Sequence, residues 1–470
     1  MSLGEFLSFG YIAAMLLAAL LIPLSGVAWL AVGSRAALIW TVVYLALILY
    51  FPNASWGVVD TDASRNFYTR GTGMFYFSAV NILLFGLVFQ SALGRGFGAL
   101  TAAKHNLGKI ALVFWLLFFG NVVVGVISGV HWFELIGYSG VLNVINFMLL
   151  FFVLMAAVQK SGDLDRFIDF FLFCAATRAV WGLVRFVAMG GDPANFYSNV
   201  QKIAIKLTFF DINDSLIATV AVFILAWRLV HGLQEGRWRK WLYIGLIALE
   251  LFVIIFSYRR TAWGGLALAA ILFAITQERR IRYPLYLAYL GLGLPLLAYK
   301  MLKRSGDAGG GGSFLERMLP DIAQGGSINF DSGRFVELAA AWDSIKESPL
   351  WGLGVWGRYS GFRYTELAWH RGDFGWMHSG VLHMMLKTGL IGVAISSMII
   401  LLVFHCAKKN WRSLPKNESG LLLAGAAGLL FMIPTWLLGT PVIEYRTMQL
   451  LALCCALPYI AIHVSKLKQE

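Results

Sequence analysis

His378 is the residue of this sequence that is best placed for acid–base chemistry. It follows a long polar stretch, Leu302 to Met377, and directly precedes an apolar segment, so its imidazole should lie where water meets a membrane. The partial positive charge at the N-terminus of the next helix favours the neutral imidazole, which can accept a proton. The sequence therefore predicts a general base here. The alternative is a histidine that only anchors the end of a helix.

Arginines form the second group with chemical potential. Arg178 and Arg185 are seven residues apart in one apolar segment and share a helical face. An arginine inside a membrane costs about 2.5–3.5 kcal/mol and normally faces a cavity or a partner, although Arg185 is near enough to the interface to snorkel. Arg259 and Arg260 lie in a short turn between apolar segments, and Arg334 starts an amphipathic stretch. Guanidinium groups bind pyrophosphate bidentately, so these arginines predict a pyrophosphate site.

Acidic residues give weaker signals. Asp60 and Asp62 form an Asp-x-Asp pattern that can bind a metal, but so short a pattern arises readily by chance and favours a solvated loop. Asp211, Asn213 and Asp214 open an apolar segment and are typical of helix capping. The chain contains no Walker A or Rossmann pattern, so no nucleotide cofactor is expected.

Composition defines the class of protein that must position these residues. Of the 470 residues, 59% are hydrophobic and 13% are charged, and the mean hydropathy is +0.71. A soluble protein has about 25% charged residues. Apolar runs recur that are long enough to cross a ~30 Å hydrocarbon core as helices. We therefore expect an all-α polytopic integral membrane protein. The net charge of +13 is concentrated in short connectors, so it predicts membrane orientation and no nucleic-acid partner.

Thirteen segments are candidates to cross the membrane, or twelve if one of the first two does not cross. Their basic connectors all fall on one side, which should be the cytoplasm, and the large polar loop then faces the periplasm. The predicted spans are residues 11–31, 36–52, 74–93, 109–129, 139–158, 167–188, 213–231, 241–257, 261–277, 283–301, 378–404, 420–438 and 447–464.

The large polar loop divides the chain into three parts. These are N-terminal transmembrane helices (1–301), a periplasmic loop (302–377) and C-terminal transmembrane helices (378–470). Helical periodicity in the loop begins near Ser332 and ends at Pro349, and a glycine-rich segment that should turn sharply follows. The apolar face of this amphipathic helix is predicted to contain Phe335, Leu338, Trp342 and Ile345, whereas Glu337, Asp343 and Lys346 are predicted to lie off that face.

Two regions of the sequence carry a recognisable pattern of residues. The first is His378 with Leu382, Met385, Gly389 and Gly392, and the second is Arg334, Trp342, Pro349, Gly352 and Gly354. These two regions resemble the O-antigen ligase and O-antigen or exopolysaccharide polymerase superfamily of bacterial membrane glycosyltransferases. Ser379 departs from the family pattern, which usually has Asn at this position.

The resemblance implies a GT-C-like membrane fold and a specific reaction. The donor would be a glycan on undecaprenyl pyrophosphate, and His378 would deprotonate the acceptor sugar hydroxyl at the periplasmic face of the inner membrane. The substrate-binding residues would be Arg178, Arg185, Arg259, Arg260 and Arg334.

The resemblance also implies inverting transfer without metal or another cofactor, and it makes acceptor binding the alternative role of the Asp211–Asp214 segment. The acceptor would be lipid A-core for a ligase, or a second lipid-linked glycan for a polymerase. A chain-length regulator stays open as a partner, as do the sugar, its linkage and the oligomeric state.

A transporter or flippase for lipid-linked sugars is the alternative from another class. It would also have many spans and buried arginines. It should show internal inverted repeats, which we do not detect, and it gives no reason for a large loop that ends at His378.

Overall fold

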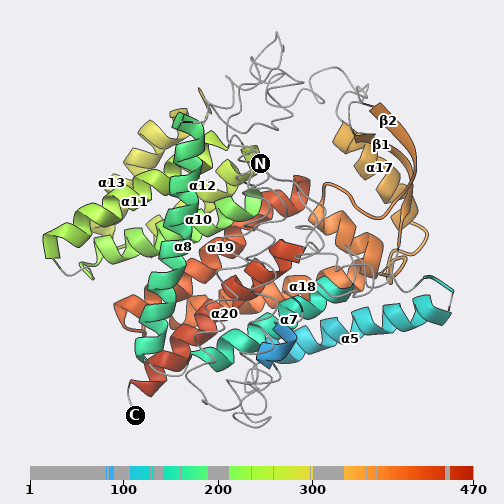
Figure 1. The fold of residues 1–470 in the computed structure, drawn as a ribbon, viewed down its shortest axis with the longest axis horizontal. Coiled ribbons are helices and arrows are strands. Elements are labelled where there is room, and N and C mark those ends of the chain that lie inside the picture. The colour runs from blue at the N-terminus through green and yellow to red at the C-terminus, as the bar shows by residue number, and fades with distance from the viewer. Residues whose placement is uncertain are drawn as a thin grey trace, which may run out of the picture.

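Figure 1 shows the fold in a computed structural model of the 470-residue chain. The structure describes residues 81, 84–88, 106–127, 129–131, 141–158, 161–188, 211–233, 236–257, 259–296, 298–299, 333–355, 357–365, 368–439 and 445–468. The predicted spans 11–31 and 36–52, and most of 74–93, lie outside these residues, so the count of twelve or thirteen stays a prediction.

Helices dominate the described part of the chain, which confirms the predicted all-α polytopic class. Six of these helices are long and apolar enough to cross a membrane. Apart from the first three, each predicted span overlaps a helix, and the span 283–301 overlaps a short helix and the π-helical turn that follows it. In chain order the helices are α5 (Asn106–Ile127), α7 (Val141–Ala157), α8 (Ser161–Ala188), α10 (Ile212–Val230), α11 (Gly236–Phe256), α12 (Arg260–Thr276), α13 (Arg279–Ala288) with the π-helical turn η4 (Tyr289–Gly293), α17 (Gly333–Ile345), α18 (Gly380–Asn410), α19 (Lys416–Leu438) and α20 (Tyr445–Leu467).

Contacts between helix termini define one end of the bundle. Trp227, near the end of α10, donates from Nε1 to the Lys416 carbonyl at the start of α19 over 2.7 Å. Lys468, just after α20, places Nζ 2.6 Å from Oε1 of Glu418. We call this the basic end, because the predicted basic connectors gather here.

The opposite termini meet at what we call the loop end. Arg446 at the start of α20 pairs with Asp214 at the start of α10, with 2.7 Å between Nη2 and Oδ1. Ser379, directly before α18, donates from Oγ to the Trp436 carbonyl near the end of α19 over 3.4 Å. His378 and the start of α20 therefore belong to the same end.

The bundle core depends on close approach of small residues along α19. A Cβ added at Gly425 would lie 2.5 Å from the Cys454 carbonyl oxygen of α20, and one at Gly428 would lie 2.5 Å from the Cys454 sulfur. On another face of α19, a Cβ at Gly265 of α12 would lie 2.1 Å from the Phe431 carbonyl oxygen. Helices α12 and α20 therefore pack directly on the α19 backbone. This packing fixes the starts of α12 and α20 relative to the C-terminus of α19.

Helix α17 and a β-hairpin cover the start of α18 (Figure 1). Strands β1 (Tyr359–Thr365) and β2 (Ala368–Phe374) pair antiparallel, with Tyr359 opposite Phe374. The helix and the following turn were predicted and are confirmed, whereas the hairpin was not predicted. A Cβ at Gly361 would lie 2.5 Å from Ala340 Cβ, so this glycine lets β1 lie directly against α17.

The predicted apolar face of α17 is wrong at two positions. Trp342 is 44% exposed, whereas the carboxylate-bearing Glu337 is only 1% exposed. The buried face is rotated because α17 packs on β1 and α18 through Ala341, Ile345 and Glu337.

Helix α18 is broken at Gly389, a feature that the predicted continuous span 378–404 did not contain. Gly389 has φ 63° and ψ −167°, a conformation open essentially to glycine alone. The break leaves backbone groups unpaired, and the turn after α17 pairs with them. Leu353 N donates to Leu386 O (2.7 Å), Gly354 N to Lys387 O (3.1 Å), Leu390 N to Pro349 O (2.9 Å), and Ile391 N to Leu350 O (3.3 Å).

The glycines of that turn are required by the same contact. Gly352 and Gly354 have φ of 71° and 90°. A Cβ at Gly352 would lie 2.6 Å from the backbone nitrogens of Thr388 and Gly389. The turn is thus locked into the helix break by backbone hydrogen bonds, and it fixes the position of α17 relative to His378.

Candidate active site

His378 stands at the loop end, with its side chain 27% exposed. Its Nδ1 lies 2.7 Å from Oε2 of Glu337, whose side chain is 2% exposed. The Trp376 ring packs edge-on against the imidazole, with 4.4 Å between ring centroids. One face of the imidazole is therefore held by the loop while part of the ring stays open to solvent.

Ser379 caps the helix that follows His378. Its Oγ accepts a hydrogen bond from Leu382 N at 3.3 Å. Serine and asparagine are comparable N-caps, so the departure from the family's usual Asn keeps the capping function. The predicted position of His378 at a helix N-terminus is confirmed.

Two buried polar side chains of α18 hold the segments on either side of the hairpin. His383 is fully buried, and its Nε2 lies 3.1 Å from the Gly375 carbonyl oxygen. Lys387, one turn later, donates from Nζ to the Gly357 carbonyl at 2.6 Å. These contacts tie both ends of the hairpin to the helix that carries His378 at its start.

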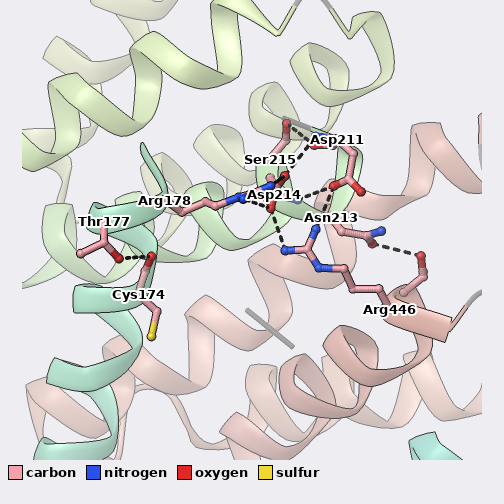
Figure 2. A network of polar contacts seen from close by, with 9 residues as sticks. Cys174, Thr177, Arg178, Asp211, Asn213, Asp214, Ser215 and Arg446 are labelled. Carbon is pink, nitrogen blue, oxygen red and sulfur yellow. Dashed lines mark hydrogen bonds and ion pairs between the residues drawn. The ribbon is translucent and has the colours of Figure 1, made fainter. Parts of the chain in front are cut away.

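Arg178 lies in a buried network of charges at the loop end (Figure 2). Its Nη2 and Nε lie 3.0 Å and 3.2 Å from Oδ2 and Oδ1 of Asp214. Arg446 approaches the same carboxylate at 2.7 Å and also lies 3.2 Å from Oδ1 of Asp211. Thr447 donates to Asn213 over 3.0 Å. The network joins the starts of α10 and α20 to α8.

The predicted capping role of the Asp211–Asp214 segment is confirmed. Asp211 is the N-cap of α10, and its side chain accepts from the Asp214 backbone at 2.8 Å. The Asp214 carboxylate accepts in return from the Asp211 backbone at 3.2 Å. Asp214 therefore serves as both a capping group and the shared counter-ion of two arginines.

Arg260 starts α12 at the loop end. Phe273 packs edge-on against Trp227 at the basic end, with 6.3 Å between ring centroids, so α12 runs away from the loop end. Gly265 lies against Phe431 of α19. Arg260 is five residues before Gly265 in α12, so it lies about 7.5 Å closer to the loop end than Gly265 does. Trp436 is five residues after Phe431 in α19, so it too lies about 7.5 Å closer to the loop end than Phe431 does.

The neighbouring arginines occupy the same end of the bundle. Arg259 is the N-cap residue of α12. The Phe186 ring of α8 packs on Phe256 at the end of α11, with 4.9 Å between centroids, so the α8 backbone at Arg185 lies near the turn that precedes Arg259. The Arg185 and Arg334 side chains lie outside the described part of the structure, as do Asp60 and Asp62. The predicted pyrophosphate-binding role of the arginines stays a prediction.

An apolar cleft of about 110 Å³ begins beside the site. It starts at Gly380 and Val381, directly after the His378–Ser379 pair, and follows α18 as far as Ile400. Its other walls come from α5, α7, α19 and α20, including Phe114, Phe147, Trp436 and Met448. His378 therefore lies between the charged residues of the loop end and the start of the apolar cleft.

Three residues of the site were not singled out from the sequence. Glu337 and His378 are 41 residues apart, so no local pattern links them. Arg446 had a usable signal, because a cation at the loop end of a span opposes the positive-inside trend just as Arg259 does. Lys387 lies within an apolar span, and a buried charge there could have marked it as structurally important.

Among the described residues, no group of three or more His, Cys, Asp and Glu side chains could hold a metal ion. No curated protein sequence matches this chain. Residues 242–397 match the family described as O-antigen ligase, over a range that includes α12, α17, the hairpin and the start of α18. The matched range contains Arg259, Arg260, Glu337 and His378. Residues 242–397 are therefore similar to the O-antigen ligase family, and this match supports membership of the chain in that family.

Proposed function

We propose that this protein is a glycosyltransferase that moves a glycan from undecaprenyl pyrophosphate to a sugar hydroxyl at the periplasmic face of the bacterial inner membrane. The family match supports glycosyl transfer of the O-antigen ligase or polymerase type. The observation that carries the proposal is the partly exposed imidazole of His378 directly before the N-cap of α18, with its Nδ1 held by the buried Glu337 carboxylate.

In this reaction His378 accepts the proton of the acceptor hydroxyl as its oxygen attacks the anomeric carbon of the donor. The bond from that carbon to the pyrophosphate oxygen breaks, and the pyrophosphate leaves with the electron pair. Direct displacement of this kind inverts the anomeric configuration. A positioned general base contributes about 10²–10⁴ in rate.

The leaving group develops negative charge that cations must stabilise. Arg259 and Arg260 are proposed to bind the pyrophosphate from the start of α12, and Arg185 and Arg334 are proposed to contribute to the same site. Arg178 is buried and already paired with Asp214, so we assign it a supporting role behind the binding site rather than direct contact with the donor.

The apolar cleft supports a lipid-linked donor. Its walls are almost entirely hydrophobic side chains, and it begins two residues after His378. A prenyl chain in this cleft would place its pyrophosphate head at the loop end, beside the imidazole and the arginines. A soluble sugar nucleotide has no lipid chain that could occupy such a cleft.

The proposal is tested with purified protein in lipid nanodiscs, supplied with undecaprenyl-pyrophosphate-linked oligosaccharide and resolved on a gel. A ladder formed from the donor alone would identify a polymerase. A shift that requires added lipid A-core would identify a ligase. Absence of product under both conditions, with a donor that a known transferase consumes, would refute glycosyl transfer to these acceptors and favour transport.

A further inference from the structure

Glu337 is a buried acid whose position the transfer reaction does not by itself explain. It lies on the inner face of α17, and its side chain is 2% exposed, whereas that of His378 is 27% exposed. The carboxylate contacts the imidazole with 2.7 Å between Oε2 and Nδ1. The solvent-facing part of the imidazole remains available to a substrate.

The surroundings of Glu337 hold the carboxylate in one orientation. Tyr359, at the start of β1, is fully buried and donates from its hydroxyl to Oε1 of Glu337 over 3.3 Å. Ala341, Ile345 and Met377 fill the space around these groups. A carboxylate buried among such side chains is costly unless it is hydrogen-bonded, so its retention at this point calls for a specific use.

The contact with Nδ1 decides which nitrogen of His378 is free. An ionised carboxylate only accepts hydrogen bonds, so in the neutral imidazole Nδ1 must carry the hydrogen. Nε2 is then the unprotonated nitrogen, able to accept a proton from a hydroxyl. When it does so, the ring becomes positively charged 2.7 Å from the Glu337 carboxylate. The same pairing of a buried acid with a catalytic histidine serves orientation and charge stabilisation in other enzyme classes.

We infer that Glu337 is the positioning residue for His378: it fixes the imidazole with Nε2 towards the acceptor and stabilises the imidazolium that forms during proton transfer. The inference rests on the proposed function, because it needs His378 to act as a base. It adds a second acid–base partner, which comes from the loop helix. The turn locked into the α18 break then has a purpose, since it holds α17, and with it Glu337, against His378.

The competing explanation is that Glu337 only holds the loop together. Tyr359 provides the comparison variant, because Tyr359→Phe removes a different hydrogen bond to the same carboxylate and leaves the His378 contact in place. If Glu337 only holds the loop together, both substitutions should lower activity by destabilising the loop. If Glu337 positions His378, its own substitution should slow the chemical step far more than Tyr359→Phe does, without a matching loss of stability.

The experiment measures kcat and the donor KM, together with thermal unfolding, for Glu337→Gln, Tyr359→Phe and His378→Ala in nanodiscs. We expect Glu337→Gln to lower kcat about 100-fold or more with donor KM within threefold, since losing the acid of a histidine–acid pair can cost ~10⁴. Tyr359→Phe should lower kcat by no more than about tenfold, since it removes one hydrogen bond to the carboxylate and keeps the contact with His378.

Two results would overturn the inference. One is a Glu337→Gln variant with kcat within threefold of the unsubstituted protein. The other is an equal loss of kcat in Glu337→Gln and Tyr359→Phe that follows their loss of stability. Either result with an inactive His378→Ala variant would leave the proposed function standing and reject only the role of Glu337. An active His378→Ala variant would reject both.

Discussion

The helix break at Gly389 should be the most sensitive backbone position of the site. Gly389→Ala forces a Cβ to within 2.1 Å of the Leu350 carbonyl oxygen, in a conformation that is nearly closed to other residues. Such backbone strain costs about 1–3 kcal/mol. If the turn separates, four backbone hydrogen bonds are lost, at about 0.5–1.5 kcal/mol each. We therefore expect Gly389→Ala to lower the free energy of unfolding by roughly 3 kcal/mol or more.

The assay is denaturant unfolding of the protein in mixed micelles, followed by transfer activity under native conditions. Gly245→Ala in α11 is the matched control, because an added Cβ there meets nothing within 4 Å and the residue is helical. Activity should fall with Gly389→Ala even where the protein remains folded, since α17 is no longer held against His378. Stability and activity equal to those of the Gly245 variant would refute the interlocking of turn and helix break.

Three other substitutions test separate parts of the site. Asp214→Asn leaves two buried guanidinium groups without their shared counter-charge and should destabilise the protein by about 3–5 kcal/mol in thermal unfolding. Asp169→Asn, in a partly exposed pair, should cost less than about 1 kcal/mol, and equal losses would contradict the structural importance of the network. Val393→Trp should narrow the apolar cleft. If it displaces two methylenes of the donor's lipid chain from the cleft, the loss is ~1.6 kcal/mol of binding free energy, so donor KM should rise roughly tenfold. Leu401→Trp on the exposed side of α18 should leave donor KM unchanged, and a similar rise in both variants would argue against the cleft as the lipid site. Arg260→Gln should reduce kcat/KM for the donor about tenfold, in line with loss of a charge-assisted hydrogen bond, and no change would remove it from the pyrophosphate site.

The sequence predicted the transmembrane helices well, because length and hydropathy largely determine them. The predicted spans 213–231, 420–438 and 447–464 agree with α10, α19 and α20 to within a few residues. His378 was recognisable for a related reason, since a change from polar to apolar sequence marks a membrane boundary. These features depend on local composition, which a single sequence displays directly.

Features that depend on contacts between distant segments were not predictable in this way. A glycine such as Gly389 is common in membrane helices, and only its contact with Leu350 shows that the helix is broken there. Glu337 appeared to belong to the polar side of α17, because the sequence does not show that Tyr359 and His378 lie opposite it. The hairpin was missed because its strands are stabilised by packing on α17 rather than by a strong alternating pattern.

The central claim is that His378 removes the acceptor proton in glycosyl transfer. The most direct measurement is single-turnover transfer by His378→Ala in nanodiscs, with donor binding measured separately and His405→Ala as the control. His405 is exposed, in the same helix, near its opposite end. We expect His378→Ala to bind the donor normally and to lose about 10²–10⁴ in the transfer rate, while His405→Ala transfers as the unsubstituted protein does. A His378→Ala variant that transfers glycan at the rate of the His405 variant would contradict the account.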